Sequence, residues 1–309
     1  MRRPTPLPAQ LSTPAFSVRD ARAAGVSPAR LRSPHLGRPY SGVRLAGADR
    51  SLATNALAYA QRMPAHHHFS HLTAAHLNGM RMPHGFRDEK LHVTAVGGGR
   101  APRVANVVGH RAESSPTTTA TPGGLRASTP VETWLDLGAL LSIRDLVVMG
   151  DGLVSKKRPV ATLDQLRRAV ASRSGRRGYR ALSEALRFIR PMSDSARETL
   201  LRLMILAAGL PEPEIDVAIL NRFGAEIAHA DLGYREYGVL IEYDGGQHRV
   251  DAWQFSVDIE RLDNLMEENW RVIRVDKMLM AKTATLIGKI TTALVAGGWR
   301  APQPAATRV

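Results

Sequence analysis

The chain has 309 residues, a formal net charge of +14 and 44% hydrophobic residues, and it contains no cysteine. This length is enough for two or three domains with cores of their own, which excludes wholesale disorder. Without cysteine there is no disulfide framework, thiolate zinc site, iron–sulfur cluster or cysteine nucleophile. Since no apolar leader follows the first residues and no apolar run could span a membrane, we expect a cytoplasmic protein without membrane association.

The charge is divided unevenly along the chain. Residues 1–112 carry 16 basic and 4 acidic side chains, whereas residues 191–280 carry 9 basic and 17 acidic ones. A basic surface favours nucleic acid through counterion release, and an excess of carboxylates suits a divalent-metal site. Arginines outnumber lysines 36 to 6, a bias that GC-rich coding also produces, so the charge alone does not identify a partner.

The first segment, residues 1–47, has the pattern of a winged helix-turn-helix domain. Ser17 and Ser27 are expected to cap two short helices, and Gly25 is expected to form the turn between them. The second helix would face the DNA major groove, and the following strands would form a wing against the backbone. An ordinary helical hairpin with solvated arginines is the alternative interpretation. The residues expected at DNA are Arg30, Arg32 and Arg44.

Residues 48–125 are predicted to form an α+β middle region, and residues 126–190 a helical connector. The first contains a helical segment at 52–63 and a strand pattern at 91–96, and residues 113–124 have the composition of a linker or exposed loop.

Five histidines lie between residues 66 and 76. His67 and His71 are four positions apart, so a helix would present them as a pair of metal ligands. However, no acidic residue occurs between Asp49 and Asp88 to complete such a site locally. Partly exposed or hydrogen-bonded histidines are therefore the favoured interpretation.

Helix and strand signals alternate in residues 191–300, in the order α-β-β-α-β-α. Helices are expected at 195–209, 253–268 and 284–296, and strands at 227–232, 239–243 and 270–275.

Acidic residues lie on two neighbouring predicted strands of this region. Asp231 is near the end of one strand and Glu242 is within the next, so a hairpin would bring both carboxylates to one edge. Carboxylates that converge in a half-buried sheet repel each other unless a cation joins them, and Mg²⁺ prefers such oxygen ligands. Two structural alternatives remain open: Asp231 as a turn residue, and Glu198 as a helix cap that pairs with Arg202.

The order of these residues resembles the PD-(D/E)XK nuclease superfamily, in the branch similar to very-short-patch repair endonucleases. The N-terminal segment resembles the winged helix of type IV, abortive-infection antitoxins. The nuclease resemblance is carried by Glu198 on a helix, Asp231 on a strand, the sequence Ile-Glu-Tyr-Asp-Gly at 241–245, His248, Asp258 and Arg261 on a helix, and the strand-like sequence at 269–275.

The resemblance implies a restriction-endonuclease-like α/β domain, a mixed sheet flanked by helices, at residues 191–300. It implies that Asp231 and Glu242 bind Mg²⁺ or Mn²⁺ for phosphodiester hydrolysis, and that Glu198 orients a metal-bound water. It further implies that Asp244 completes the carboxylate cluster, that His248 shuttles a proton or holds the phosphate, and that Arg261 contacts the DNA backbone or pairs with Asp258. The family's usual lysine is replaced by Asp244 here, so its role is vacant or passes to His248.

The favoured hypothesis is a Mg²⁺-dependent DNA endonuclease acting in defence, mobile-element conflict or repair. DNA is the expected partner, and a toxin or another operon product is a further candidate. The main alternative is a non-catalytic DNA-binding regulator, an antitoxin-like repressor that retains a nuclease fold. A protein–protein adaptor is the third hypothesis.

Overall fold

The computed structural model describes residues 6–11, 13–82, 90–113, 117–220, 222–244 and 265–301. The chain forms two compact units: unit 1 comprises Met1–Met149 and Val160–Leu186, and unit 2 comprises Gly150–Pro159 and Arg187–Val309. No helix in the described part of the chain has both the length and the apolarity needed to cross a membrane.

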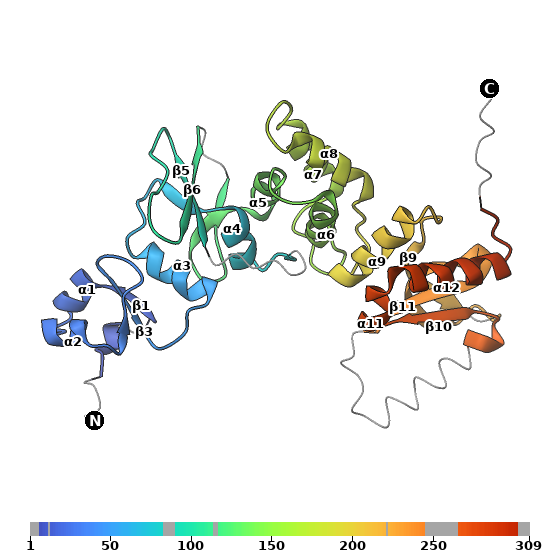
Figure 1. Ribbon diagram of the computed structural model, residues 1–309, viewed down its shortest axis with the longest axis horizontal. Coiled ribbons are helices and arrows are strands. Elements are labelled where there is room, and N and C mark those ends of the chain that lie inside the picture. The colour runs from blue at the N-terminus through green and yellow to red at the C-terminus, as the bar shows by residue number, and fades with distance from the viewer. Residues whose placement is uncertain are drawn as a thin grey trace. The chain divides into compact units, whose positions relative to one another are not determined.

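Unit 1 begins with a small α+β segment around a three-stranded sheet of order β1-β3-β2 (Figure 1). Both of its helices start at a serine whose Oγ accepts a hydrogen bond from the backbone N–H three residues later, at 3.0 Å for Ser17 and 3.2 Å for Ser27. Gly25 has a φ of 81°, which a side chain would strain. The predicted caps and turn are therefore confirmed. The elements are η1 (Ala9–Leu11), β1 (Ala15–Ser17), α1 (Val18–Ala23), α2 (Pro28–Arg32), β2 (Leu36–Gly37) and β3 (Val43–Ala46).

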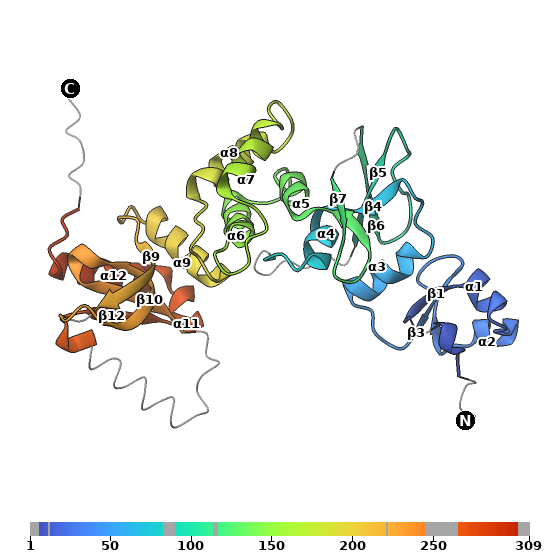
Figure 2. The same cartoon turned by 180° about the vertical axis from the view of Figure 1, so that it is seen from behind.

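A five-stranded mixed sheet of order β6-β5-β4-β8-β7 forms the next part of unit 1 (Figure 2). Its apolar face packs Phe69, Leu91 and Val93 against Tyr59. Its elements are α3 (Leu52–Ala60), β4 (His67–Phe69), α4 (His71–Leu77), β5 (Leu91–Val96), β6 (Val107–Ala112), β7 (Thr118–Ala120), β8 (Arg126–Ser128) and α5 (Pro130–Leu137).

The structure excludes the disfavoured histidine-pair alternative, and it shows that one sequence prediction in this part is wrong. His67 lies in strand β4 and His71 starts helix α4, so one helix does not present the two as a ligand pair. Residues 118–120, predicted as loop, form β7, because they pair with β8 in an antiparallel ladder. Threonine favours strands, but the Ser, Pro and Gly residues on either side give residues 113–124 the composition of a loop, so the strand becomes evident only from its pairing with β8.

Three helices follow: α6 (Ile143–Leu153), α7 (Leu163–Ala171) and α8 (Tyr179–Phe188). The fully buried Trp134 of α5 donates from its indole Nε1 to the carbonyl of Leu146 at 2.9 Å, which fixes α5 against α6. Helix α7 begins with a complete capping box between Thr162 and Gln165.

Unit 2 is an α/β unit whose four-stranded mixed sheet has the order β12-β11-β10-β9. Strands β9, β10 and β11 are antiparallel neighbours, and β12 is parallel to β11. Helices α9 and α12 contribute Leu201, Ile205 and Ile290 to a core with Leu232 and Ile241 of the sheet. The elements are α9 (Ala196–Ala207), β9 (Glu214–Leu220), β10 (Glu226–Tyr234), η2 (Arg235–Tyr237), β11 (Val239–Tyr243), β12 (Arg271–Val275), α11 (Lys277–Ala281) and α12 (Thr283–Ala296).

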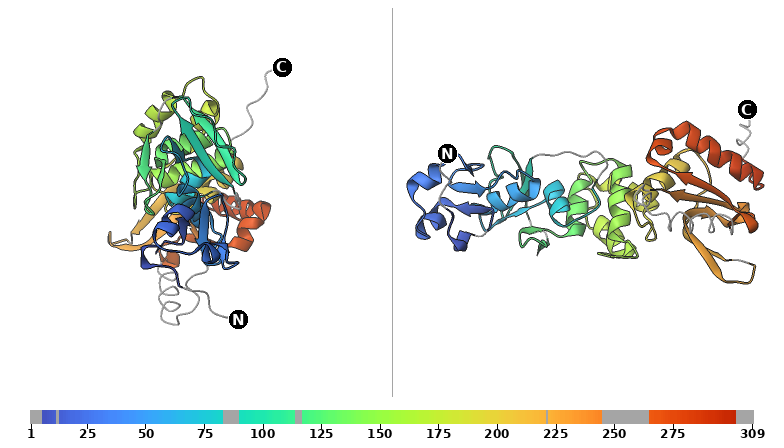
Figure 3. Two further views of the ribbon diagram at one scale, coloured as in Figure 1. Left: turned by 90° about the vertical axis from the view of Figure 1, so that its left-hand side faces the viewer. Right: turned by 90° about the horizontal axis from the view of Figure 1, so that it is seen from below.

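The predicted helices at 195–209 and 284–296 and the three predicted strands of unit 2 are confirmed within two residues at their ends. Strand β9 was not predicted; it pairs with β10, and Figure 3 shows this hairpin extending beyond the rest of the sheet. Residues 253–264 of the expected third helix lie outside the described residues.

Candidate functional site

A cavity of about 620 Å³ in unit 2 is lined by acidic and basic side chains from several elements. It brings together two of the sequence-predicted residues, Glu198 and Asp231. The described side chains with charge around it are those of Lys156, Lys157, Asp194, Glu198, Asp216, Asp231 and the titratable His229.

The position of Asp231 follows from the point at which β10 and β11 separate. Their backbone register ends at the pair Leu232↔Ile241. Two residues further along β11, the backbone N–H of Tyr243 donates to Oδ2 of Asp231 at 2.6 Å instead of continuing the ladder. The Asp231 carboxylate therefore lies at the backbone between Glu242 and Asp244. The interpretation of Asp231 as a turn residue is wrong, because it lies within β10.

Asp216 of β9 is a further acid at this position that the sequence analysis missed. The β9–β10 register places it opposite Asp231, between the pairs Val217↔Ala230 and Ile215↔Leu232. Its φ of 56° is unusual for a non-glycine residue, so the strand is distorted at this carboxylate. Asp216 contacts Lys156 Nζ at 3.3 Å and His229 Nδ1 at 3.2 Å.

Glu198 is buried in the first turn of α9, where its backbone N–H donates to Oγ of Ser195 at 3.1 Å. Its Oε2 accepts a hydrogen bond from the backbone N–H of Asp194 at 2.7 Å. The predicted capping role of Glu198 is therefore confirmed, because its carboxylate accepts a hydrogen bond from a backbone amide at the helix start. The alternative pairing of Glu198 with Arg202 is wrong, because the guanidinium of Arg202 forms its ion pairs with Asp151 and Glu212.

Glu242 and Asp244 are half-buried at the carboxyl end of β11 and are not among the described residues that line the cavity. Glu242 is the register partner of Arg274 on β12, and the backbone N–H of Asp244 donates to the carbonyl of Val275 at 2.9 Å. His248 and Arg261 lie outside the described residues, as does Asp258.

Two lysines supply positive charge beside these acids. Lys157 Nζ lies 2.5 Å from the Asp194 carboxylate, whose hydrogen bond raises the pKa of Lys157. The sequence could have singled out these lysines, since Lys156 and Lys157 are the one adjacent lysine pair in an arginine-rich sequence. The sequence could not show that they lie beside these acids, because Lys156 is 60 positions from Asp216.

The three arginines predicted to contact DNA differ in their surroundings. Arg32 of α2 is exposed and Arg30 is half-buried. Arg44 of β3 donates from Nε to the carbonyl of Leu31 at 2.8 Å and from Nη1 to that of Val43 at 2.9 Å. Its guanidinium therefore joins α2 to the sheet.

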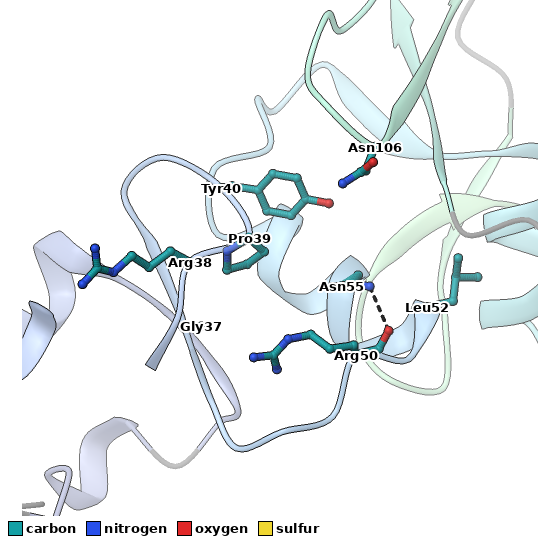
Figure 4. Close-up of a pocket in the computed structure, with 8 residues that line it drawn as sticks. All are labelled: Gly37, Arg38, Pro39, Tyr40, Arg50, Leu52, Asn55 and Asn106. Atoms are coloured by element: carbon teal, nitrogen blue, oxygen red, sulfur yellow. Dashed lines mark hydrogen bonds between the residues drawn. The ribbon is translucent and has the colours of Figure 1, made fainter. Parts of the chain in front are cut away.

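A second cavity, of about 630 Å³, lies in unit 1 (Figure 4). Arg38, Arg50, Asn55 and Asn106 line it together with Tyr40. Burial raises the pKa of Tyr40 to about 12, so its hydroxyl stays a donor at neutral pH. Among the described residues that line this cavity there is no carboxylate, so its charge suits an anion such as a phosphate.

Comparison with known proteins leaves the family open. No family model matches the chain, and no solved structure gives a significant match. The chain is similar to an uncharacterized protein found in two strains of Mycobacterium tuberculosis, with 28% identity over 131 residues. The similarity covers 39% of this chain and 48% of the relative, so the chain spans about half the length of the curated relatives it matches.

Proposed function

We propose that unit 2 is a Mg²⁺- or Mn²⁺-dependent DNA endonuclease of the PD-(D/E)XK type and that the basic unit 1 binds the DNA. The observation that carries the proposal is the hydrogen bond from the Tyr243 N–H to Asp231, which holds one carboxylate at the backbone between two others. Glu198 and Asp216 add carboxylates from a helix and a further strand to the cavity that Asp231 lines.

The arrangement of unit 2 supports this proposal. The resemblance implies a mixed sheet flanked by helices. The four-stranded sheet of unit 2 is mixed, and helices α9 and α12 share a core with it.

The donor set fits the expected ion. Asp231 and Glu242 would hold Mg²⁺, which binds through one or two carboxylates and keeps its remaining positions for water and substrate phosphate. When bound, the ion would polarise the scissile phosphate and favour the ionised form of the attacking water.

The other side chains have separate tasks in the hydrolysis. The attacking water gives up one proton as its oxygen forms a bond to phosphorus. The bond from phosphorus to the leaving oxygen breaks, and that oxygen takes up a proton. Glu198 would accept a hydrogen bond from the attacking water and orient it. Lys156 and Lys157 would offset charge on the phosphate, a role that Asp244 cannot fill at the position of the family's lysine.

Unit 1 offers a basic surface for the DNA backbone. Arg32, Arg38 and Arg50 are exposed, and the last two line the cavity of Figure 4. Backbone contacts of this kind provide affinity without sequence specificity. The proposed setting in defence, mobile-element conflict or repair comes from the resemblance alone.

The test is cleavage of supercoiled plasmid by the full chain with Mg²⁺ or Mn²⁺, with EDTA as the metal-free control. We expect Asp231→Asn and Glu242→Gln to abolish cleavage, whereas Glu236→Gln, an exposed acid in the same hairpin, should cut as the wild type does. Tight DNA binding without cleavage under every metal would favour the DNA-binding regulator. Absence of both DNA binding and cleavage would leave the adaptor.

A further inference from the structure

Unit 1 contains a cluster of histidines that come from three neighbouring strands and one helix. His68 of β4 is the antiparallel partner of Thr94 of β5, and Thr94 is the parallel partner of His110 of β6. Because side chains two apart on a strand share a face, His92 lies on the same face as Thr94. His71 starts helix α4, directly after β4.

The rings of three of these histidines are close enough to share one ligand. His92 Nδ1 lies 2.9 Å from His110 Nε2, and the rings of His71 and His110 stack with centroids 3.7 Å apart. One ring nitrogen from each of His71, His92 and His110 lies within 4.8 Å of the other two. A tetrahedral ion with bonds of about 2.0–2.1 Å places its nitrogen ligands about 3.3–3.4 Å apart, so adjustments on the order of 1 Å would complete the site.

The backbone and a neighbouring hydroxyl position His71 for this cluster. His71 has a φ of 49°, a backbone conformation that residues other than glycine rarely adopt. Ser70 Oγ contacts Nδ1 of His71 at 3.0 Å and accepts a hydrogen bond from Thr94 Oγ1 at 2.8 Å. Such a contact on one ring nitrogen orients the other toward an ion, as the outer partners of metal-bound histidines do.

A buried nitrogen without a hydrogen-bond partner indicates that the cluster is incomplete without a ligand. The Nε2 of His68 has no hydrogen-bond partner within the described ranges, although His68 is only 2% exposed. A buried polar atom without a partner is destabilising, and a water held by an ion would supply one.

The cluster opens onto a third cavity, of about 820 Å³. His71, Thr94 and His110 line it, with Arg173 and Asp136 among the other lining residues. Since two of the three histidines line this polar cavity, water or an anion can reach a fourth position on the ion, which distinguishes open zinc sites from closed structural ones.

We propose that His71, His92 and His110 bind one Zn²⁺ through their ring nitrogens, with the fourth position open to this cavity. Imidazole donors suit Zn²⁺ and related transition metals, whereas Mg²⁺ prefers the carboxylates proposed for unit 2. The zinc site therefore does not depend on the proposed nuclease function.

The experiment uses the full chain without an affinity tag, stripped of metal with EDTA and titrated with Co²⁺ and then with Zn²⁺. We expect one equivalent of Co²⁺ to give the intense visible absorption of a four-coordinate ion, and Zn²⁺ to displace it. His110→Gln should weaken binding at least about 100-fold, since loss of even an outer partner commonly costs 10–100-fold. His76→Gln replaces an exposed histidine of the same helix and should leave the affinity unchanged.

Three results would overturn the proposal. The first is a weak, six-coordinate Co²⁺ spectrum of the wild type, which needs no variant and is therefore independent of folding defects. The second is unaltered binding by a folded His110→Gln variant. The third is equal loss of binding in His76→Gln. Asp231→Asn serves as a further control and should bind Zn²⁺ as the wild type does, even if the nuclease proposal fails.

Discussion

Replacement of Asp151 tests how unit 2 holds the helix that carries Glu198. Oδ1 of Asp151 accepts a hydrogen bond from the Arg190 N–H at 2.7 Å, and Oδ2 accepts from Thr199 Oγ1 at 2.8 Å and Arg202 Nη2 at 3.0 Å. The side chains of Asp151 and Arg202 are both 0% exposed. Because Thr199 directly follows Glu198, this carboxylate fixes the first turn of α9.

The cost of Asp151→Ala follows from what it leaves behind. The charge of Arg202 stays buried, with Glu212 at 3.3 Å as its other carboxylate contact, and the hydroxyl of Thr199 loses an acceptor. Removal of one partner from a buried pair costs about 3–5 kcal/mol. Since 1.4 kcal/mol is a factor of ten, amide exchange that requires unfolding of unit 2 should become at least about 100-fold faster.

Hydrogen exchange read by mass spectrometry on peptides from β10 and β11 measures this effect for unit 2 separately. The matched control is Glu214→Ala, which removes an exposed pair with Arg235 whose side chains are 53% and 46% exposed. Such a pair contributes about 0–1 kcal/mol, so exchange should change less than about fivefold. The double replacement Asp151→Leu, Arg202→Met should restore much of the protection, because neither charge then remains buried alone. Equal exchange in Asp151→Ala and Glu214→Ala would refute the reasoning.

Three further predictions concern charge in the two units. Lys156→Met and Lys157→Met should each lower kcat of DNA cleavage about 100-fold with little change in KM, and steady-state kinetics showing an effect on KM alone would contradict this. Burial raises the pKa of Asp136 from its ordinary value of 3.8 to about 6. The folded state therefore binds this proton more tightly than the unfolded state does, and the stability of the protein falls as pH rises from about 4 to 6. Denaturant unfolding of metal-free protein should therefore show Asp136→Asn more stable than wild type by about 1–3 kcal/mol at pH 7 and equal to it near pH 4; an equal difference at both pH values would count against this. Arg32→Ala should weaken DNA binding and reduce the salt slope by about 1, whereas Arg44→Ala should lower the thermal midpoint because its guanidinium bonds two backbone carbonyls; the reverse pattern in binding and melting curves would contradict both roles.

Local patterns in the sequence were sufficient for most elements of unit 2. The apolar run at residues 239–241, followed by Glu242 and Tyr243, predicts β11 at its observed bounds. Strand β9 escaped prediction because it follows Pro211 and Pro213 and contains Glu214 and Asp216. Its conformation depends on pairing with β10, which no local propensity encodes.

Local sequence patterns predict even less of the candidate sites, because the residues of each site come from segments far apart in the chain. The hairpin predicts that Asp231 and Glu242 lie on neighbouring strands, because both belong to one continuous segment. Lys156 joins the same cavity from a distant segment, and only the tertiary fold determines this. The histidine cluster likewise depends on the parallel register that places His110 beside Thr94.

Binding of Mn²⁺ to metal-free protein tests the central claim that Asp231 and Glu242 share one divalent ion. Electron paramagnetic resonance of free Mn²⁺ should show one site whose affinity falls in Asp231→Asn and in Glu242→Gln but not in Glu236→Gln. The double variant should be little weaker than either single one, because two ligands of one ion are coupled. Retention of that site in both single variants, or independent and additive losses, would contradict the claim.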